Sequence, residues 1–191
     1  MALKLITAAT APIVTLAEAK RHVRAEDFTD DDSYLESLVE VATEHINGAQ
    51  GWLGRAFLES TWEFRLDCFP LDRINIPLPP LRSVETVEYV KTDGTTGTVT
   101  DFRSFGVGLS VGSGYILPVY DGEWPDTLDD EPEAVRITFK AGYDAPPKQL
   151  KHAMLLIVGD WYKNREDIID LKSSKQPRGA DALLYPLRFW G

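Results

Sequence analysis

Apolar residues along this chain recur with two different spacings, which divide it into helical and strand-forming stretches. In residues 12–58 they recur every three or four positions, the spacing of helices with one buried face. A first helix is predicted from the capping box Thr15-Leu16-Ala17-Glu18. A second is predicted to end near Gly51 and Gly54. Its apolar stripe consists of Leu35, Leu38, Ala42, Ile46, Ala49 and Leu53.

Residues 60–141 change to a period of two, which is typical of half-buried strands. Trp62, Phe64 and Leu66 alternate with charged residues, and Val135, Ile137 and Phe139 do the same with polar and charged ones. Thr92-Asp93-Gly94-Thr95 supplies a hairpin turn. This stretch is therefore predicted to be an antiparallel β subdomain inserted between helices.

The third stretch begins at Pro146-Pro147, a favourable helix start, and predicts a C-terminal helix over 146–167. Leu155, Leu156 and Val158 make its middle apolar nearly all round, so it should be buried on more than one side. Residues 168–191 are predicted to form an extended C-terminal tail. We expect one α+β domain over residues 1–191: a helical bundle core of two N-terminal helices and a long C-terminal helix, with the β insertion and the tail.

The apolar end of the chain, Leu183-Leu184-Tyr185-Pro186-Leu187-Arg188-Phe189-Trp190, follows a polar stretch over 172–179. Chain ends are usually polar and loosely held. Tyr, Trp and Arg are also the residues enriched at interface hot spots. Composition alone leaves two readings open, since the segment either packs on its own core or is offered to another chain.

The charge balance argues against a protein that grips nucleic acid. Twenty Lys and Arg stand against thirty Asp and Glu, for a formal net charge of −10. No apolar run reaches the roughly 20 residues that a membrane-spanning helix needs. A signal peptide over residues 1–16 is disfavoured because Thr7, Thr10 and Pro12 interrupt the apolar run. The single cysteine, Cys68, excludes an intrachain disulfide and fits synthesis in a reducing compartment.

The residues that suggest catalysis each have a simpler structural explanation. Asp30-Asp31-Asp32 invites a metal site, but three consecutive carboxylates before a helix more simply supply its N-cap. Asp129-Asp130-Glu131 fits a solvated loop. The glycine-rich segment 106–114 lacks the Lys of a phosphate-binding loop and is read as a connector between strands.

The histidines give no metal pair and no evident catalytic dyad. His22, His45 and His152 lie in separate predicted helices, none with a second histidine one turn away. Cys68 has no histidine near it in sequence, so a Cys–His dyad would need a chance approach in space. The sequence therefore predicts no catalytic, cofactor-binding or metal-binding residue, and no enzyme.

Several segments together resemble the phage head–tail connector (adaptor) family, found in tailed phages and in phage-like gene transfer particles. The opening helix over 15–24 and the second helix with its continuation to 54–57 resemble the family's first two helices. The most specific piece is Val135-Arg136-Ile137-Thr138-Phe139-Lys140-Ala141-Gly142-Tyr143, followed by Pro147 and the segment 161–166. The ending over 182–188 also agrees, whereas the match is loosest in the β zone over 60–141.

The resemblance implies a structural virion protein at the head–tail junction, made in the bacterial cytoplasm. It would form a ring with copies of itself, a dodecamer in the particle, coaxial with the portal protein. Its other side would receive a stopper or tail-completion protein, and DNA would pass through the lumen without specific binding. No activity, cofactor or membrane contact comes with the family. An acidic subunit would repel the DNA phosphates over a Debye length of ~8 Å.

The resemblance and the residues together predict two sets of contact residues. The portal-binding tail would be Leu183, Leu184, Tyr185, Pro186, Leu187, Arg188, Phe189 and Trp190. The subunit-interface candidates are Arg55, Arg82, Leu155, Leu156, Val158 and Trp161, the two arginines facing a neighbour's carboxylates. Two alternatives stay open. One is another joining component, a stopper or tail-completion protein, and the other is a metal-dependent hydrolase using Asp30, Asp32 and Asp129.

Overall fold

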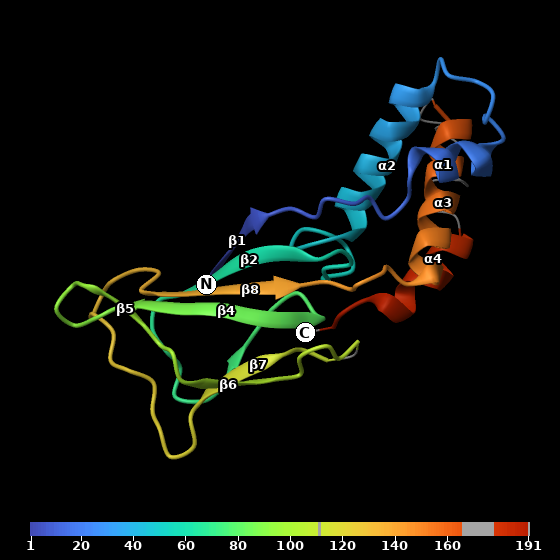
Figure 1. Ribbon diagram of the computed structural model, residues 1–191. Helices are drawn as coiled ribbons and strands as arrows, with labels where there is room; N and C mark the ends of the chain where they lie inside the picture. The colour runs from blue at the N-terminus through green and yellow to red at the C-terminus, as the bar shows by residue number, and fades with distance from the viewer. Residues whose placement is uncertain (111, 166–177, 191) are drawn as a thin grey trace, which may run out of the picture. The chain divides into compact units, whose positions relative to one another are not determined.

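The chain forms two compact units, each assembled from two separate stretches of sequence (Figure 1). The computed structural model describes residues 1–110, 112–165 and 178–190. Met1–Thr10 and Leu58–Asp144 form the first unit, here called the β unit. Ala11–Phe57 and Ala145–Gly191 form the second, here called the helical unit. Helices and antiparallel sheets are both present, which confirms the α+β class.

A five-stranded antiparallel sheet is the larger part of the β unit (Figure 1). Its strands, in spatial order, are β1 (Ala2–Thr7), β2 (Ser60–Leu66), β8 (Val135–Ala141), β4 (Leu81–Val90) and β5 (Thr96–Thr98). β8 lies at the centre, where Val135, Ile137 and Phe139 are fully buried. Phe139 pairs with Trp62 on one side and Val84 on the other. The predicted alternation in β2 and β8 is thus confirmed, because one face of these strands forms the core.

The predicted turn at 92–95 joins β4 to β5 as a hairpin. Gly94 has a φ of 81°, a value that favours glycine, and its N–H donates to the carbonyl of Lys91. The Asp93 carboxylate accepts from both the N–H and the hydroxyl of Thr95, at 2.9 and 2.6 Å. The hairpin turn predicted from the sequence is therefore confirmed at this position.

A smaller sheet of three strands completes the β unit. Its order is β3 (Ile74–Asn75), β7 (Tyr115–Pro118) and β6 (Phe102–Phe105). Ile74 and Ile116 pair with each other and are both buried. The glycine-rich segment 106–114, of which residue 111 lies outside the described residues, joins β6 to β7. It is a connector between strands, as the sequence predicted.

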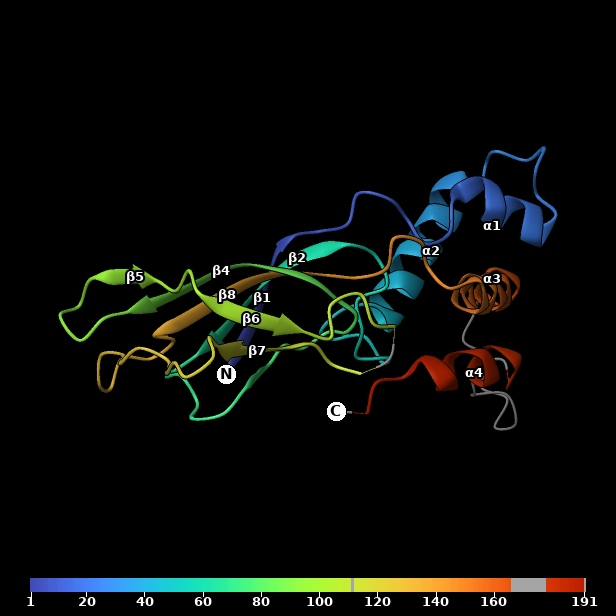
Figure 2. The ribbon, with the colours of Figure 1, turned by 60° about the horizontal axis from the view of Figure 1, so that its bottom comes forward.

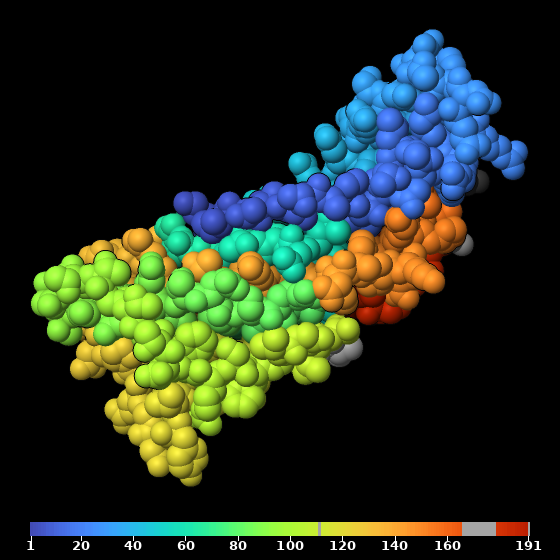
Figure 3. Space-filling model, viewed as in Figure 1, coloured from blue at the N-terminus to red at the C-terminus, as the bar shows by residue number. Residues whose placement is uncertain are grey.

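Strand β1 was missed by the sequence analysis, which placed the β region at 60–141. It pairs with β2 in antiparallel register from Ala2↔Arg65 to Thr7↔Thr61. Five of its six residues are exposed and only Leu3 is partly buried, so no buried periodicity reveals it. Figure 3 shows these dark blue N-terminal residues open on the surface of the β unit beside β2.

In the helical unit, three helices pack on a fourth (Figure 2). Its elements are α1 (Leu16–Val23), α2 (Asp32–Ile46), α3 (Lys148–Lys163), α4 (Arg178–Leu184) and a 3-10 helix, η1 (Tyr185–Leu187). α3 contacts α1, α2 and α4. Its buried residues are Leu150, Ala153, Met154, Ile157 and Val158. The central helix is therefore covered on more than one side within its own chain.

The capping box at the start of α1 is confirmed. The N–H of Glu18 donates to the Thr15 hydroxyl, and the Thr15 N–H donates back to the Glu18 carboxylate at 2.9 Å. The same carboxylate accepts from Lys151 of α3 at 2.5 Å. The Lys151 ammonium, together with the Thr15 backbone N–H, lowers the pKa of Glu18 to about 2. A local helix cap is thus tied to the central helix.

The predicted end of α2 was wrong, because the helix stops at Ile46 and does not reach Leu53. Asn47 is extended, and its side-chain oxygen accepts from the N–H of Phe57 at 2.8 Å. Gly48, with a φ of 83°, donates its N–H to the carbonyl of Arg55 at 2.7 Å. These bonds fold residues 47–57 back as a compact loop, in which Leu53 is still fully buried.

The expectation of an extended tail is also corrected for the residues that the structure describes. Residues 178–187 are helical, as α4 and η1. Ala180 and Leu184 have no exposed surface, because α4 packs against α3. Residues 168–177 of the predicted tail, and the last two of the predicted helix over 146–167, lie outside the described residues.

We expect Phe139→Ala to destabilise the β unit by about 3–5 kcal/mol, because it removes a fully buried ring from the central strand. Arg136→Ala, at an exposed position of the same strand, should change stability by only about 0.5 kcal/mol or less. Urea unfolding followed by circular dichroism measures both. Equal effects of the two substitutions would contradict the assignment of β8 to the core.

We expect acid to weaken the helical unit partly through Glu18. Its pKa of about 2 in the folded chain lies below the ordinary value of 4.5. The unfolded chain therefore takes up the proton first, and stability present above pH 4.5 is lost as the pH falls toward 2. Glu18→Gln keeps a residue that can complete the capping box but cannot titrate. Thermal unfolding between pH 2 and 6 should be less pH-dependent for this variant than for wild type.

The control for that comparison is Glu40→Gln, at an exposed position on α2. A pH dependence of Glu18→Gln identical to that of wild type would contradict the role of the Glu18–Lys151 pair.

Candidate protein–protein interface

The C-terminal segment is held against the helical unit by a few specific contacts. Leu184 is fully buried, and the Gln149 side chain of α3 donates to the carbonyl of Leu183 at 3.3 Å. Further along, the Phe189 N–H donates to the carbonyl of Leu53 at 2.9 Å. The Arg55 guanidinium lies 5.9 Å from the centre of the Phe189 ring. The segment thus docks on the loop that ends the first helical stretch.

Around this docked segment, aromatic rings gather on the surface of the helical unit. The rings of Tyr185 and Trp190 lie 5.8 Å apart and are 61% and 63% exposed as residues. The Arg188 guanidinium lies 4.2 Å from the centre of the Trp190 ring and 5.1 Å from that of Trp52. We call these residues, Trp52, Tyr185, Arg188, Phe189 and Trp190, the C-terminal aromatic patch. Residues of these types, exposed and clustered, can anchor a protein partner.

Of the eight residues predicted as a portal-binding tail, only some have side chains exposed enough to contact a partner. Leu184 is a correction, because its side chain is fully buried against α3 in its own subunit. Leu183, Leu187, Arg188 and Phe189 are half-buried, whereas Tyr185, Pro186 and Trp190 are exposed. Of the two readings left open by the composition, packing on its own core is confirmed for Leu184. Contact of the exposed residues with another chain stays a prediction.

The predicted subunit-interface residues also differ in how far they are buried within their own unit. Val158 is fully buried within its own unit, so it is removed from the candidates. Leu155, Leu156 and Trp161 are half-buried. Arg55 is 6% exposed, too little for an ion pair with a neighbour in this conformation.

Arg82 is already paired inside its own β unit. Its guanidinium lies 2.5 Å from the Asp144 carboxylate and 3.4 Å from that of Glu59. The hydrogen bond from Arg82 lowers the pKa of Asp144 and raises the pKa of Arg82 itself. The predicted pairing of Arg82 with a neighbour's carboxylate would therefore have to compete with these two acids.

The acidic run before α2 does not cap the helix as predicted. Asp31 occupies the N-cap position but makes no side-chain capping bond. Its carboxylate accepts instead from the Tyr162 hydroxyl at 2.7 Å and from Arg165. These two donors lower the pKa of Asp31, and Asp31 in turn raises the pKa of Tyr162. Asp32 pairs with Lys20 of α1 at 2.6 Å. The acidic residues serve to join helices.

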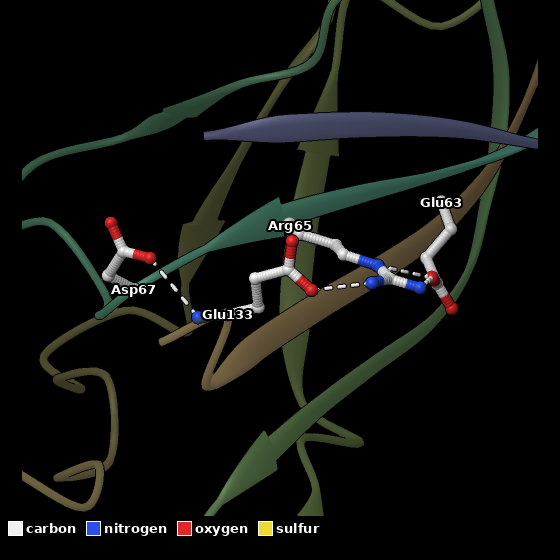
Figure 4. A network of polar contacts seen from close by, with 4 residues as sticks. All are labelled: Glu63, Arg65, Asp67 and Glu133. Carbon is white, nitrogen blue, oxygen red and sulfur yellow. Dashed lines mark hydrogen bonds and ion pairs between the residues drawn. The ribbon is translucent and has the colours of Figure 1, made fainter. Parts of the chain in front are cut away.

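An ion-pair network on the β unit ties the end of a long loop to the sheet (Figure 4). Arg65 on β2 lies between the carboxylates of Glu63 and Glu133, at 2.6 and 2.5 Å. The Asp67 carboxylate accepts from the backbone N–H of Glu133 at 3.1 Å. Both glutamates raise the pKa of Arg65. Every charge drawn in this network has a partner of opposite sign or a backbone donor, which is typical of a structural role.

In the part of the chain that the structure describes, no group of three or more His, Cys, Asp or Glu could hold a metal ion. Cys68 belongs to the β unit and is exposed, whereas His22, His45 and His152 belong to the helical unit. Among the described helices, none is long and apolar enough to cross a bilayer.

The β unit does contain an apolar hollow of about 410 Å³. Its walls come mainly from β2 and the segment that follows, and they include Phe64, Leu66, Pro70 and Ile74. Asp67, Cys68 and Arg73 are the ionisable residues on its lining. Such a hollow suits an apolar side chain better than a reaction that needs several aligned polar groups.

The fold has counterparts in solved structures of gene transfer agent (GTA) particles. One chain, from a structure described as the neck of an empty GTA particle computed with C6 symmetry, aligns with a TM-score of 0.79 at 22% identity. A chain from the virion of a native GTA particle aligns with a TM-score of 0.79 at 23% identity. Each alignment covers 100% of this chain and 97% of the other.

A third chain, from the neck of a native GTA particle computed with C12 symmetry, aligns with a TM-score of 0.67 at 21% identity over the same shares. No model of a protein family and no curated protein matches the chain. At these identities the likeness shows a shared fold, which extends over the full length of this chain.

Proposed function

We propose that this chain is a structural adaptor of a phage-like particle, one subunit of a ring that joins the capsid portal to the tail. The observation that carries the proposal is the full-length match of its fold, through both units, to chains of GTA necks and virions. The resemblance of its sequence segments to the head–tail connector family supports the same role. In this proposal the helical unit is the adaptor's bundle and the β unit is the insertion within it.

The C-terminal aromatic patch is the proposed contact with the portal protein. The neighbouring residue Leu184 is buried and holds the segment on the helical unit, whereas Tyr185 and Trp190 of the patch are mostly exposed. Apolar and aromatic surface of this kind gains free energy when a partner covers it. Leu155, Leu156 and Trp161 remain the proposed contacts between neighbouring copies of the ring.

The charge of the chain fits a ring through which DNA passes without being held. A net charge of −10 per copy opposes close approach of phosphates to the subunit. The proposed role involves no turnover and no cofactor. A stopper or tail-completion protein would bind the side of the ring away from the portal.

We expect the double substitution Tyr185→Ala/Trp190→Ala to weaken portal binding by about 30-fold or more, which corresponds to hot-spot losses of about 2 kcal/mol. The fold should be retained, because both side chains are largely exposed. Calorimetry or surface-based binding with the purified portal protein of the same genome measures the affinity. Deleting 183–191 is a poorer test, since it also removes the buried Leu184.

Tyr120→Ala is the matched control, a tyrosine of the β unit that is 79% exposed. It should bind the portal as wild type does. Unchanged binding of the double variant would refute the assignment of the patch. Binding of the wild-type chain to a stopper or tail-completion protein, with none to the portal, would move the protein to another joining role.

A further inference from the structure

The C-terminal aromatic patch contains an arginine whose guanidinium lies close to two aromatic rings. Arg188 lies with its guanidinium carbon 4.2 Å from the Trp190 ring centre and 5.1 Å from that of Trp52. Trp52 comes from the loop over 47–57, which the Phe189–Leu53 backbone bond holds against the C-terminal segment. Two aromatic side chains far apart in the sequence thus flank one cation.

Stacking of this kind leaves the edge of the guanidinium unused. The aromatic rings interact with the faces of the planar group, whereas its five N–H donors point outward within the plane. Among the contacts of the described residues, the Arg188 guanidinium makes no hydrogen bond and no ion pair, and only the backbone N–H of Arg188 donates, to the carbonyl of Tyr185. The residue is half-buried, so part of its surface remains open to a partner. An arginine in this position can donate hydrogen bonds to a planar acceptor.

The same helical unit contains a completed example of this arrangement. The Arg165 guanidinium lies 4.9 Å from the ring centres of both Tyr34 and Tyr162. One of its terminal N–H groups donates to the carboxylate of Asp31, which also accepts from the Tyr162 hydroxyl. Arg188 repeats the stacked cation between two aromatic rings but lacks the acid. The comparison identifies a carboxylate as the group that would complete it.

We propose that Arg188, between Trp52 and Trp190, receives an Asp or Glu side chain of a different protein, one that carries apolar residues beside the acid. This proposal rests on the proposed function and names the chemistry by which the partner is recognised at that site. The acid would bind the free edge of the guanidinium through two parallel N–H donors. The neighbouring apolar side chains would cover the exposed rings of Tyr185 and Trp190.

The geometry separates arginine from lysine at this position. A lysine ammonium keeps the positive charge but has neither the flat faces that stack nor the two-pronged edge. If charge alone attracted the partner, Arg188→Lys would bind as wild type does. If Arg188 between Trp52 and Trp190, here called the arginine clamp, binds the acid as proposed, the substitution removes most of the selectivity for the acid while leaving the net charge unchanged.

The test uses the full chain, labelled with ¹⁵N, and two short peptides with blocked ends, acetyl-Leu-Glu-Leu-amide and acetyl-Leu-Gln-Leu-amide. We expect the Glu peptide to shift the side-chain N–H signals of Arg188, Trp52 and Trp190 and to bind at least tenfold more tightly than the Gln peptide. Arg188→Lys should remove that tenfold preference. Arg103→Lys, at an arginine 5.8 Å from the Phe105 ring in the β unit, is the matched control and should keep it.

Several outcomes would overturn the proposal. Equal binding of the two peptides, or an unchanged preference in Arg188→Lys, would show that no carboxylate is selected. A short DNA duplex that shifts the same signals more strongly than the Glu peptide would assign the site to phosphate. Self-association of the chain in sedimentation that Arg188→Lys abolishes would make a second copy the occupant.

Portal binding, measured separately, distinguishes this proposal from the proposed function. If wild type and Arg188→Lys bind the portal equally, the clamp is wrong and the adaptor role stands. If wild type does not bind the portal, the portal contact fails whatever the peptides show.

Discussion

The burial of α3 among α1, α2 and α4 is the constraint on which the helical unit depends. α1, α2 and α4 all contact this helix, and α1 also packs against α2. Polar links then fix the positions: Glu18 of α1 binds Lys151, and Asp31 before α2 binds Tyr162 and Arg165. With α4 held through Leu184, the C-terminal aromatic patch acquires a rigid base. Interfaces of high affinity need such preorganised anchors.

The features that could be predicted from sequence are those determined by neighbouring residues. The capping box at Thr15, the turn at Gly94 and the alternation of Ile137 and Phe139 each depend on a handful of adjacent positions. Local hydrogen bonds and the period of burial encode them directly. The head–tail connector resemblance added an expectation of fold that the alignment to GTA particle chains supports.

The features that could not be predicted depend on contacts between distant residues, or on exposure. β1 lies at a sheet edge and is almost wholly exposed, so its sequence has no buried period. α2 ends early because Asn47 binds Phe57, although Ala49 and Leu53 continue the apolar spacing. Asp31 is drawn away from its cap by Tyr162 and Arg165. The pairing of Trp52 with Arg188 joins the two separate stretches of the helical unit, so no local sequence pattern could predict it.

The division of each unit between two stretches of sequence has a consequence for synthesis on the ribosome. The β unit is complete once Asp144 has emerged, since its last stretch is Leu58–Asp144. α1 and α2 are made much earlier, yet the helix that covers them follows only after residue 145. The apolar faces of α1 and α2 therefore stay uncovered by α3, exposed or bound by a chaperone, until the intervening sheet has been translated. The C-terminal aromatic patch forms last, so a chain that stops before residue 185 lacks the proposed portal contact.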